Sequence, residues 1–133
     1  MRRYLAIVAI ALAAACATNH AASRSAEPEG TVARIWHSRT TDARAAEYYD
    51  YLMREGIAKI EAIPTNRGCD VMTRSHGGET EFIVISYWRS LDDIHAFAGA
   101  DISKTHNLPR DAEMLLELEP NVRHFEVRHS ARR

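Results

Sequence analysis

The residues most able to do chemistry begin on a predicted strand, residues 31–38 (TVARIWHS). Side chains alternate across a strand, so Arg34 and Trp36 share one face and His37 lies on the other. The Arg34 and Trp36 face would offer a small molecule a cationic anchor and an aromatic wall. The alternative is that Trp36 belongs to the core and Arg34 pairs with a carboxylate. Both interpretations stay open at this stage, as does the question of which face lines a site.

A second candidate is the pair His106-Asn107, in an irregular segment between short predicted helices. Histidine is the side chain whose ordinary pKa lies nearest neutrality, so it can move protons. A lone loop histidine is also a common solvated residue. His106 therefore has a functional interpretation and an ordinary one.

Other kinds of site find no support in the sequence. His37, His95 and His124 show no H-x-x-x-H or H-x-H spacing, so no metal site is predicted. A G-x-S-x-G motif, a glycine-rich phosphate loop and a cysteine with a partner histidine are all missing from the printed sequence, and Cys69 is interpreted as a small buried strand residue. Acidic residues at predicted helix starts (Asp92, Asp93, Asp111 and Glu113) are interpreted as charges that favour the helix dipole.

Hydrophobic periodicity predicts the elements that must position these residues. The order is β-α-β-β-α-β, the ferredoxin-like split repeat of the α+β class. The predicted elements are strand 31–38, a helix over about 42–63, strand 69–75, a Gly-Gly hairpin turn at 76–79, strand 81–88, a helix from 91 to Gly99, short helical pieces at 101–107 and 109–116, and strand 122–128.

Two helices carry informative details. On the first, an apolar stripe recurs at three- and four-residue steps (Ala45, Tyr48, Leu52, Gly56, Ile60, Ile63), and Pro64 ends the helix. Gly56 costs about 1 kcal/mol against alanine there, which predicts that another element approaches closely. On the second, Ser90 and Asp93 resemble a capping box, and Leu91, Ile94 and Phe97 or Ala98 are expected to point inward.

Strand 81–88 is apolar on both faces (Phe82, Val84, Ser86, Trp88 on one; Ile83, Ile85, Tyr87 on the other). A strand of this kind is covered on both sides. One main helix covers only one of them, so the pattern predicts that a second copy's sheet covers the other face, in a homodimer.

Charge excludes one class of partner. The chain has 17 basic and 18 acidic residues and no basic stripe to follow phosphates, so nucleic acid is not an expected partner. The length suits one domain, expected at residues 31–128 and followed by a basic tail, 129–133.

The N-terminus predicts export. Arg2 and Arg3 precede an apolar run from Tyr4 to Ala15, which is too short to span a bilayer. Cys16 after small residues resembles a bacterial lipobox, whose cysteine takes a lipid, although Ala13-Ala14-Ala15 also satisfies ordinary signal peptidase. Residues 1–20 are therefore expected to be a signal segment and 21–30 a tether. The protein is expected to be periplasmic or lipid-anchored to the cell envelope, in contact with membrane only through this segment.

Residues 31–127 resemble the antibiotic biosynthesis monooxygenase-like (ABM) superfamily of dimeric α+β barrels. The matching pieces are Val32-Ala33-Arg34-Ile35-Trp36-His37, Trp88-x-Ser90-Leu91-Asp92, Phe97-Ala98-Gly99-x-Asp101, and the run from Leu115 through Glu119-Pro120 to Val127. The resemblance implies a homodimer with its sheets face to face, and in each subunit a pocket between sheet and helices for a small apolar or aromatic molecule.

The resemblance also implies an activity, oxidation of a polycyclic phenol or anthrone by oxygen without a bound cofactor. It names His106 and Arg34 as catalytic candidates and Trp36, Trp88, Phe97 and Asn107 as candidate substrate contacts. Trp88 also fits a core or interface role. In the haem-degrading branch, the spacing would put Phe97 at a tryptophan position and Asn107 at the iron-ligand position, one residue from His106. The competing hypothesis is a non-catalytic ligand-binding or stress-associated lipoprotein.

Overall fold

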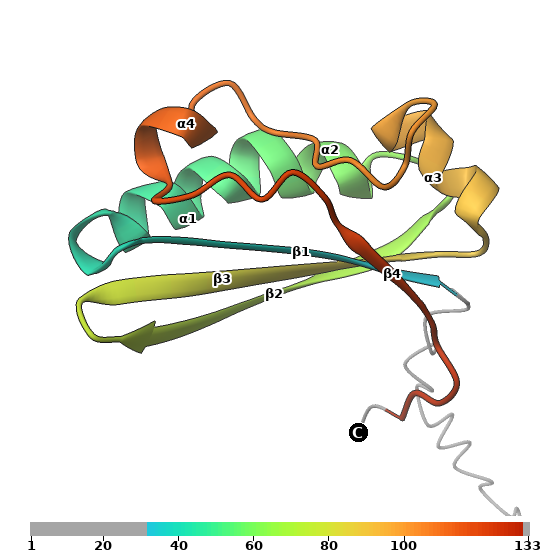
Figure 1. The fold of residues 1–133 in the computed structure, drawn as a ribbon. Coiled ribbons are helices and arrows are strands. Elements are labelled where there is room, and N and C mark those ends of the chain that lie inside the picture. The colour runs from blue at the N-terminus through green and yellow to red at the C-terminus, as the bar shows by residue number, and fades with distance from the viewer. Residues whose placement is uncertain (1–31, 132–133) are drawn as a thin grey trace, which may run out of the picture.

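A computed structural model describes residues 32–131, and the chain folds as an α+β domain with ferredoxin-like topology (Figure 1). The strands are β1 (Val32–Thr41), β2 (Asn66–His76), β3 (Glu79–Trp88) and β4 (Arg123–Glu126). They form one antiparallel sheet in the order β2-β3-β1-β4, the arrangement that a split β-α-β repeat produces. The predicted fold class is confirmed.

The β2–β3 hairpin closes as predicted, through Gly77 and Gly78, whose φ angles of 65° and 84° favour glycine. β4 is shorter than its predicted strand and pairs only with Val32–Ile35 of β1. Beyond that point residues 115–122, here called the return segment, border β1, with Leu116 N–H donating to the Arg39 carbonyl at 2.8 Å.

The first helix is continuous but not uniform. A 3₁₀ turn (Asp42–Arg44) leads into α1 (Ala45–Leu52), a π-helical turn (Met53–Ile57) and α2 (Ala58–Glu61). Gly56 sits in the π turn, and a Cβ there would lie 3.3 Å from Leu108 Cδ1. The close approach expected at Gly56 is therefore confirmed, with Leu108 as the approaching residue.

The later helices correct two expectations. α3 (Leu91–Ala98) is capped at its start by Ser90, whose hydroxyl accepts from Asp93 N–H, and at its end by Gly99. Leu91 was expected to point inward and is 48% exposed, because the inward positions of this short helix belong to Ile94 and Phe97. The helical piece expected at 101–107 is absent: this part of the loop between α3 and α4 (residues 99–110) consists of turns and a bridge, Lys104 to Asn121. α4 spans Asp111–Met114.

All the helices lie on one face of the sheet (Figure 1). The hydrophobic core lies between the helices and the sheet. It comprises two clusters, one around Tyr48, Leu52 and Phe82 and one around Ile60, Trp88 and Ile94. Among residues 32–131, none of the helices has the length and hydropathy of a membrane-spanning segment. The expected signal segment, tether and Cys16 lipidation site lie outside the described residues.

Candidate functional site

A cavity of about 50 Å³ lies between the sheet and the helices. Most of its wall is apolar, and β1, β3, the first helix, the 99–110 loop and the return segment all contribute. The lining residues are Arg34, Trp36, Tyr48, Leu52, Gly56, Ile57, Ile60, Val84, Ser86, Phe97, His106, Leu108, Asp111 and Val122. The Arg34 and Trp36 face of β1 is thus the face that meets the pocket.

Arg34 is the buried cation of this pocket, only 4% exposed. Its guanidinium donates to two backbone carbonyls of the 99–110 loop, those of Ile102 and Lys104 (the latter at 2.9 Å). No carboxylate within residues 32–131 pairs with it, and burial lowers the pKa of Arg34 to about 10. Carbonyl dipoles orient the guanidinium, but they do not neutralise its charge.

His124 on β4 also contacts Arg34, with 3.2 Å between Nε2 and Nη1. A guanidinium has no acceptor, so Arg34 must donate and Nε2 must accept. The imidazole is then neutral, with its proton on Nδ1. Burial and the Arg34 charge both lower the pKa of His124, in agreement with this assignment. The contact leaves the positive charge of Arg34 uncompensated.

An aromatic group lies beside Arg34. Phe97 of α3 lies under the guanidinium at 5.6 Å and against the His106 ring at 5.0 Å between centroids. A cation over an aromatic face is held by the ring quadrupole. Arg34, Phe97 and His106 thus form one contiguous side of the pocket.

Asp111 and Tyr48 contribute a buried polar pair to the pocket wall. Tyr48 Oη donates to Asp111 Oδ1 at 3.1 Å, and Leu108 N–H donates to Oδ2 at 2.7 Å. Asp111 is 2% exposed, and desolvation raises its pKa despite these two bonds. A carboxyl group with a raised pKa that faces a cavity is a common form of general acid or base.

The structure brings together four of the six residues proposed for the pocket: Arg34, Trp36, Phe97 and His106. Trp88 and Asn107 are not part of its lining. Trp88 is fully buried, stacks on Phe97 at 6.3 Å and donates Nε1–H to Ser86, so it is a core residue behind the pocket wall. Asn107 is exposed on the loop and does not reach the pocket, whereas His106, also exposed, borders it.

Three residues at the pocket or in contact with Arg34 were not predicted as functional from the sequence. Asp111 resembled an ordinary helix-start charge, Tyr48 resembled an apolar stripe residue, and His124 carried no motif. Their partners lie 63, 63 and 90 positions away in the chain, so no local spacing could have identified them. Cys69 is half-buried and packs against both core clusters, and burial raises its pKa to about 12, which makes it a poor nucleophile.

No protein-family model matches the chain, and no curated protein matches it either. Among solved structures it is similar to the heme-degrader MhuD of Mycobacterium tuberculosis, whose structure has two hemes bound in its active site. The two are 19% identical with a TM-score of 0.48, over 75% of this chain and 98% of that one. A likeness this distant says nothing about the pocket, so the ABM resemblance stays a prediction from the sequence.

Proposed function

We propose that the protein binds a small, largely apolar or aromatic molecule carrying an acidic hydroxyl or carboxylate, in the pocket between sheet and helices. The observation that carries the proposal is Arg34, a buried guanidinium with no carboxylate partner in the described chain. A buried charge without a counter-charge is costly, and an anionic ligand would supply that counter-charge. The apolar walls around it would hold the rest of the molecule.

The size of the cavity bears on how a ligand enters. A volume of about 50 Å³ holds a few water-sized groups, and a molecule of several rings exceeds it. The 99–110 loop supplies two of the lining side chains, His106 and Leu108. We therefore expect this loop to move outward when a larger ligand binds.

The same residues support oxidation by oxygen as the reaction. His106 or Asp111 would accept a proton from the bound molecule, and Arg34 would stabilise the resulting anion. The electron-rich anion would then reduce O₂ directly: a substrate CH₂ becomes C=O, one oxygen atom enters the product and the other leaves as water. The competing hypothesis, binding without chemistry, uses the pocket and Arg34 alone.

Binding is tested by calorimetric titration with a hydroxylated anthrone. Charge-assisted hydrogen bonds contribute about 1.5–3 kcal/mol, so Arg34→Met should weaken binding roughly 10- to 100-fold. Arg39→Met is the matched control, because Arg39 lies on the same strand and already has two carboxylate partners. Equal affinity in the wild type and Arg34→Met would refute the proposed anchor.

Oxygen uptake at saturating anthrone separates the enzyme from the binding protein. Uptake that falls in His106→Ala or Asp111→Asn while anthrone still binds supports the oxidation. Uptake equal to a no-protein control, over a panel of phenols and anthrones, supports binding alone. A Soret shift on titration with haem would instead assign the pocket to haem.

We also propose that a second copy covers the open face of the sheet. Met72 and Phe125 are 46% and 49% exposed there, beside Ile83, Ile85 and Tyr87. The same face carries arginines and glutamates near the β2–β3 hairpin. Two copies can therefore pack their apolar residues together and pair the arginines of one copy with the glutamates of the other. Native mass spectrometry should find a dimer that Phe125→Glu dissociates, and a wild-type monomer would refute it. Export stays a prediction from the sequence.

A further inference from the structure

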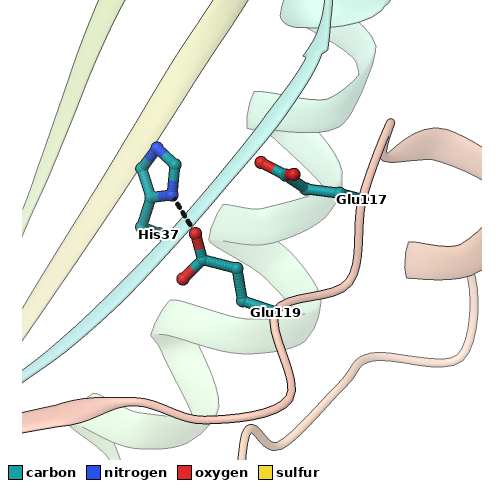
Figure 2. Close-up of side chains that lie close together, drawn as sticks. All are labelled: His37, Glu117 and Glu119. Atoms are coloured by element: carbon teal, nitrogen blue, oxygen red, sulfur yellow. Dashed lines mark hydrogen bonds and ion pairs between the residues drawn. The ribbon is translucent and has the colours of Figure 1, made fainter.

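A second cluster of ligand-type side chains lies away from the pocket, where β1 meets the return segment. His37 comes from β1, and Glu117 and Glu119 come from the return segment (Figure 2). One nitrogen or oxygen atom from each residue lies within 4.8 Å of the other two. We infer that His37, Glu117 and Glu119 bind one divalent cation of the zinc class, which takes imidazole and carboxylate ligands.

The backbone holds these three residues in place before any ion arrives. Ser38 Oγ–H donates to the Glu117 carbonyl at 2.8 Å, next to the Leu116–Arg39 backbone bond. Glu117 and Glu119 are two positions apart in an extended segment, so their side chains leave it on the same side. The site is therefore assembled by the fold, and ion binding needs little rearrangement.

The histidine is oriented as a metal ligand normally is. His37 Nε2 lies 2.9 Å from Glu81 Oε1, and Nδ1 lies 2.5 Å from Glu119 Oε1. Metal-binding histidines generally donate their second N–H to a carboxylate, which fixes the tautomer. Here Glu81 is that outer carboxylate and Nδ1 is the ligand atom. In the absence of an ion a proton must lie between Nδ1 and Glu119, and the cation would take its place.

The charges around His37 favour a cation of charge two. Once an ion has displaced the proton between His37 and Glu119, four carboxylates (Glu79, Glu81, Glu117 and Glu119) face two guanidiniums (Arg39 and Arg74) in this network, which leaves an excess of two negative charges. Arg39 forms ion pairs with Glu79 and with one oxygen of Glu117, and Arg74 forms an ion pair with Glu81. Glu119 alone meets no guanidinium in the part of the chain described, so its charge is available to an ion.

This site is independent of the proposed ligand pocket. Arg34 and Trp36 point to the helix side of β1, whereas His37 pairs with Glu81 on the other side. An ion here would join the return segment to β1 through side chains as well as through the backbone.

Zinc titration of the chelator-treated protein, in competition with a chromogenic chelator, tests the inference. We expect one tight site, a zinc-dependent rise in melting temperature, and at least tenfold weaker binding in both His37→Ala and Glu119→Gln. Glu81→Gln, which alters the outer partner of His37 and also removes the Arg74 ion pair, should weaken binding about 10- to 100-fold. Glu113→Gln, another exposed glutamate paired with an arginine, is the matched control and should bind as the wild type does.

Glu119→Gln preserves the shape of the side chain and one acceptor oxygen at a part-exposed position, so it should fold normally. Its melting temperature without zinc, compared with that of the control, verifies this. Zinc affinity unchanged in both Glu119→Gln and His37→Ala would overturn the site. So would a wild type that binds zinc no more tightly than these two variants.

Discussion

Arg34 and Arg39 lie on the same strand, five positions apart, yet they face opposite environments. Arg34 points under the helices, where it is 4% exposed and burial lowers its pKa to about 10. Arg39 points to the open face, where bonds to Glu117 and Glu79 raise its pKa. One guanidinium is held by carbonyls and the other by carboxylates.

The difference separates a charge without a carboxylate partner among residues 32–131 from one that two carboxylates neutralise. Arg39 is neutralised by its neighbours, and its ion pairs are part-exposed and screened by salt. Arg34 is desolvated, and none of the described residues supplies it with a counter-charge. Residues that are costly to the fold in this way concentrate at functional sites. We therefore expect polar changes on the covered face to matter more than those on the open face.

The largest stability effect is expected from Tyr48→Phe on the covered face. Removing the hydroxyl leaves Asp111 Oδ1 buried without a donor, which should cost about 1–3 kcal/mol of unfolding free energy. Urea denaturation measures the change, and Tyr49→Phe, an exposed neighbour on the same helix, is the control. A loss no greater than that of Tyr49→Phe would mean that the Tyr48–Asp111 bond contributes little.

A smaller effect should come from His124, and it should depend on pH. The unfolded chain protonates this residue near pH 6.5, whereas the folded protein, with its lowered pKa, does so only at lower pH. Between the two values the unfolded state binds more protons, so stability falls as the pH drops through this window. Denaturation from pH 8 to pH 5 should show a shallower fall in His124→Gln than in the wild type.

His95→Gln is the control for this series, because His95 is an exposed histidine at the end of α3. It should keep the wild-type slope. If His124→Gln kept that slope as well, the neutral imidazole assigned beside Arg34 would be wrong.

The smallest effect is expected from Arg39→Met on the open face. It breaks two part-exposed ion pairs, so the loss of stability should be smaller than that of Tyr48→Phe and should shrink as salt rises. Thermal denaturation at low and high ionic strength measures both features. A salt-independent loss as large as that of Tyr48→Phe would remove the contrast between the two faces.

Much of the fold was predictable because its determinants are local. Alternation marked the strands, Gly77-Gly78 marked the hairpin, and Ser90 and Gly99 marked the two ends of α3. The same alternation placed Arg34 and Trp36 on one face of β1. Short elements were harder to predict, because the 101–107 segment takes its shape from contacts with the return segment.

The candidate sites were only partly predictable because their contacts are long-range. His37 and Glu119 are 82 positions apart, and Tyr48 and Asp111 are 63 apart. A histidine without a neighbouring histidine and an aspartate at a helix start have common ordinary explanations, so neither signals a site alone. Only the return of the chain past β1 brings these pairs together.

The π turn at Met53–Ile57 has a consequence for changes in chain length. Tyr48, Leu52, Gly56 and Ile60 recur in four-residue steps, which in a plain α-helix would drift by about 40° at each step because each residue turns about 100°. The wider π turn absorbs part of that drift and keeps both halves of the helix against the sheet. A deletion of one residue within 53–57 should convert this turn to α-helix and leave the flanking core contacts in register. A deletion in α1 or α2 would rotate half of the helix away from the sheet.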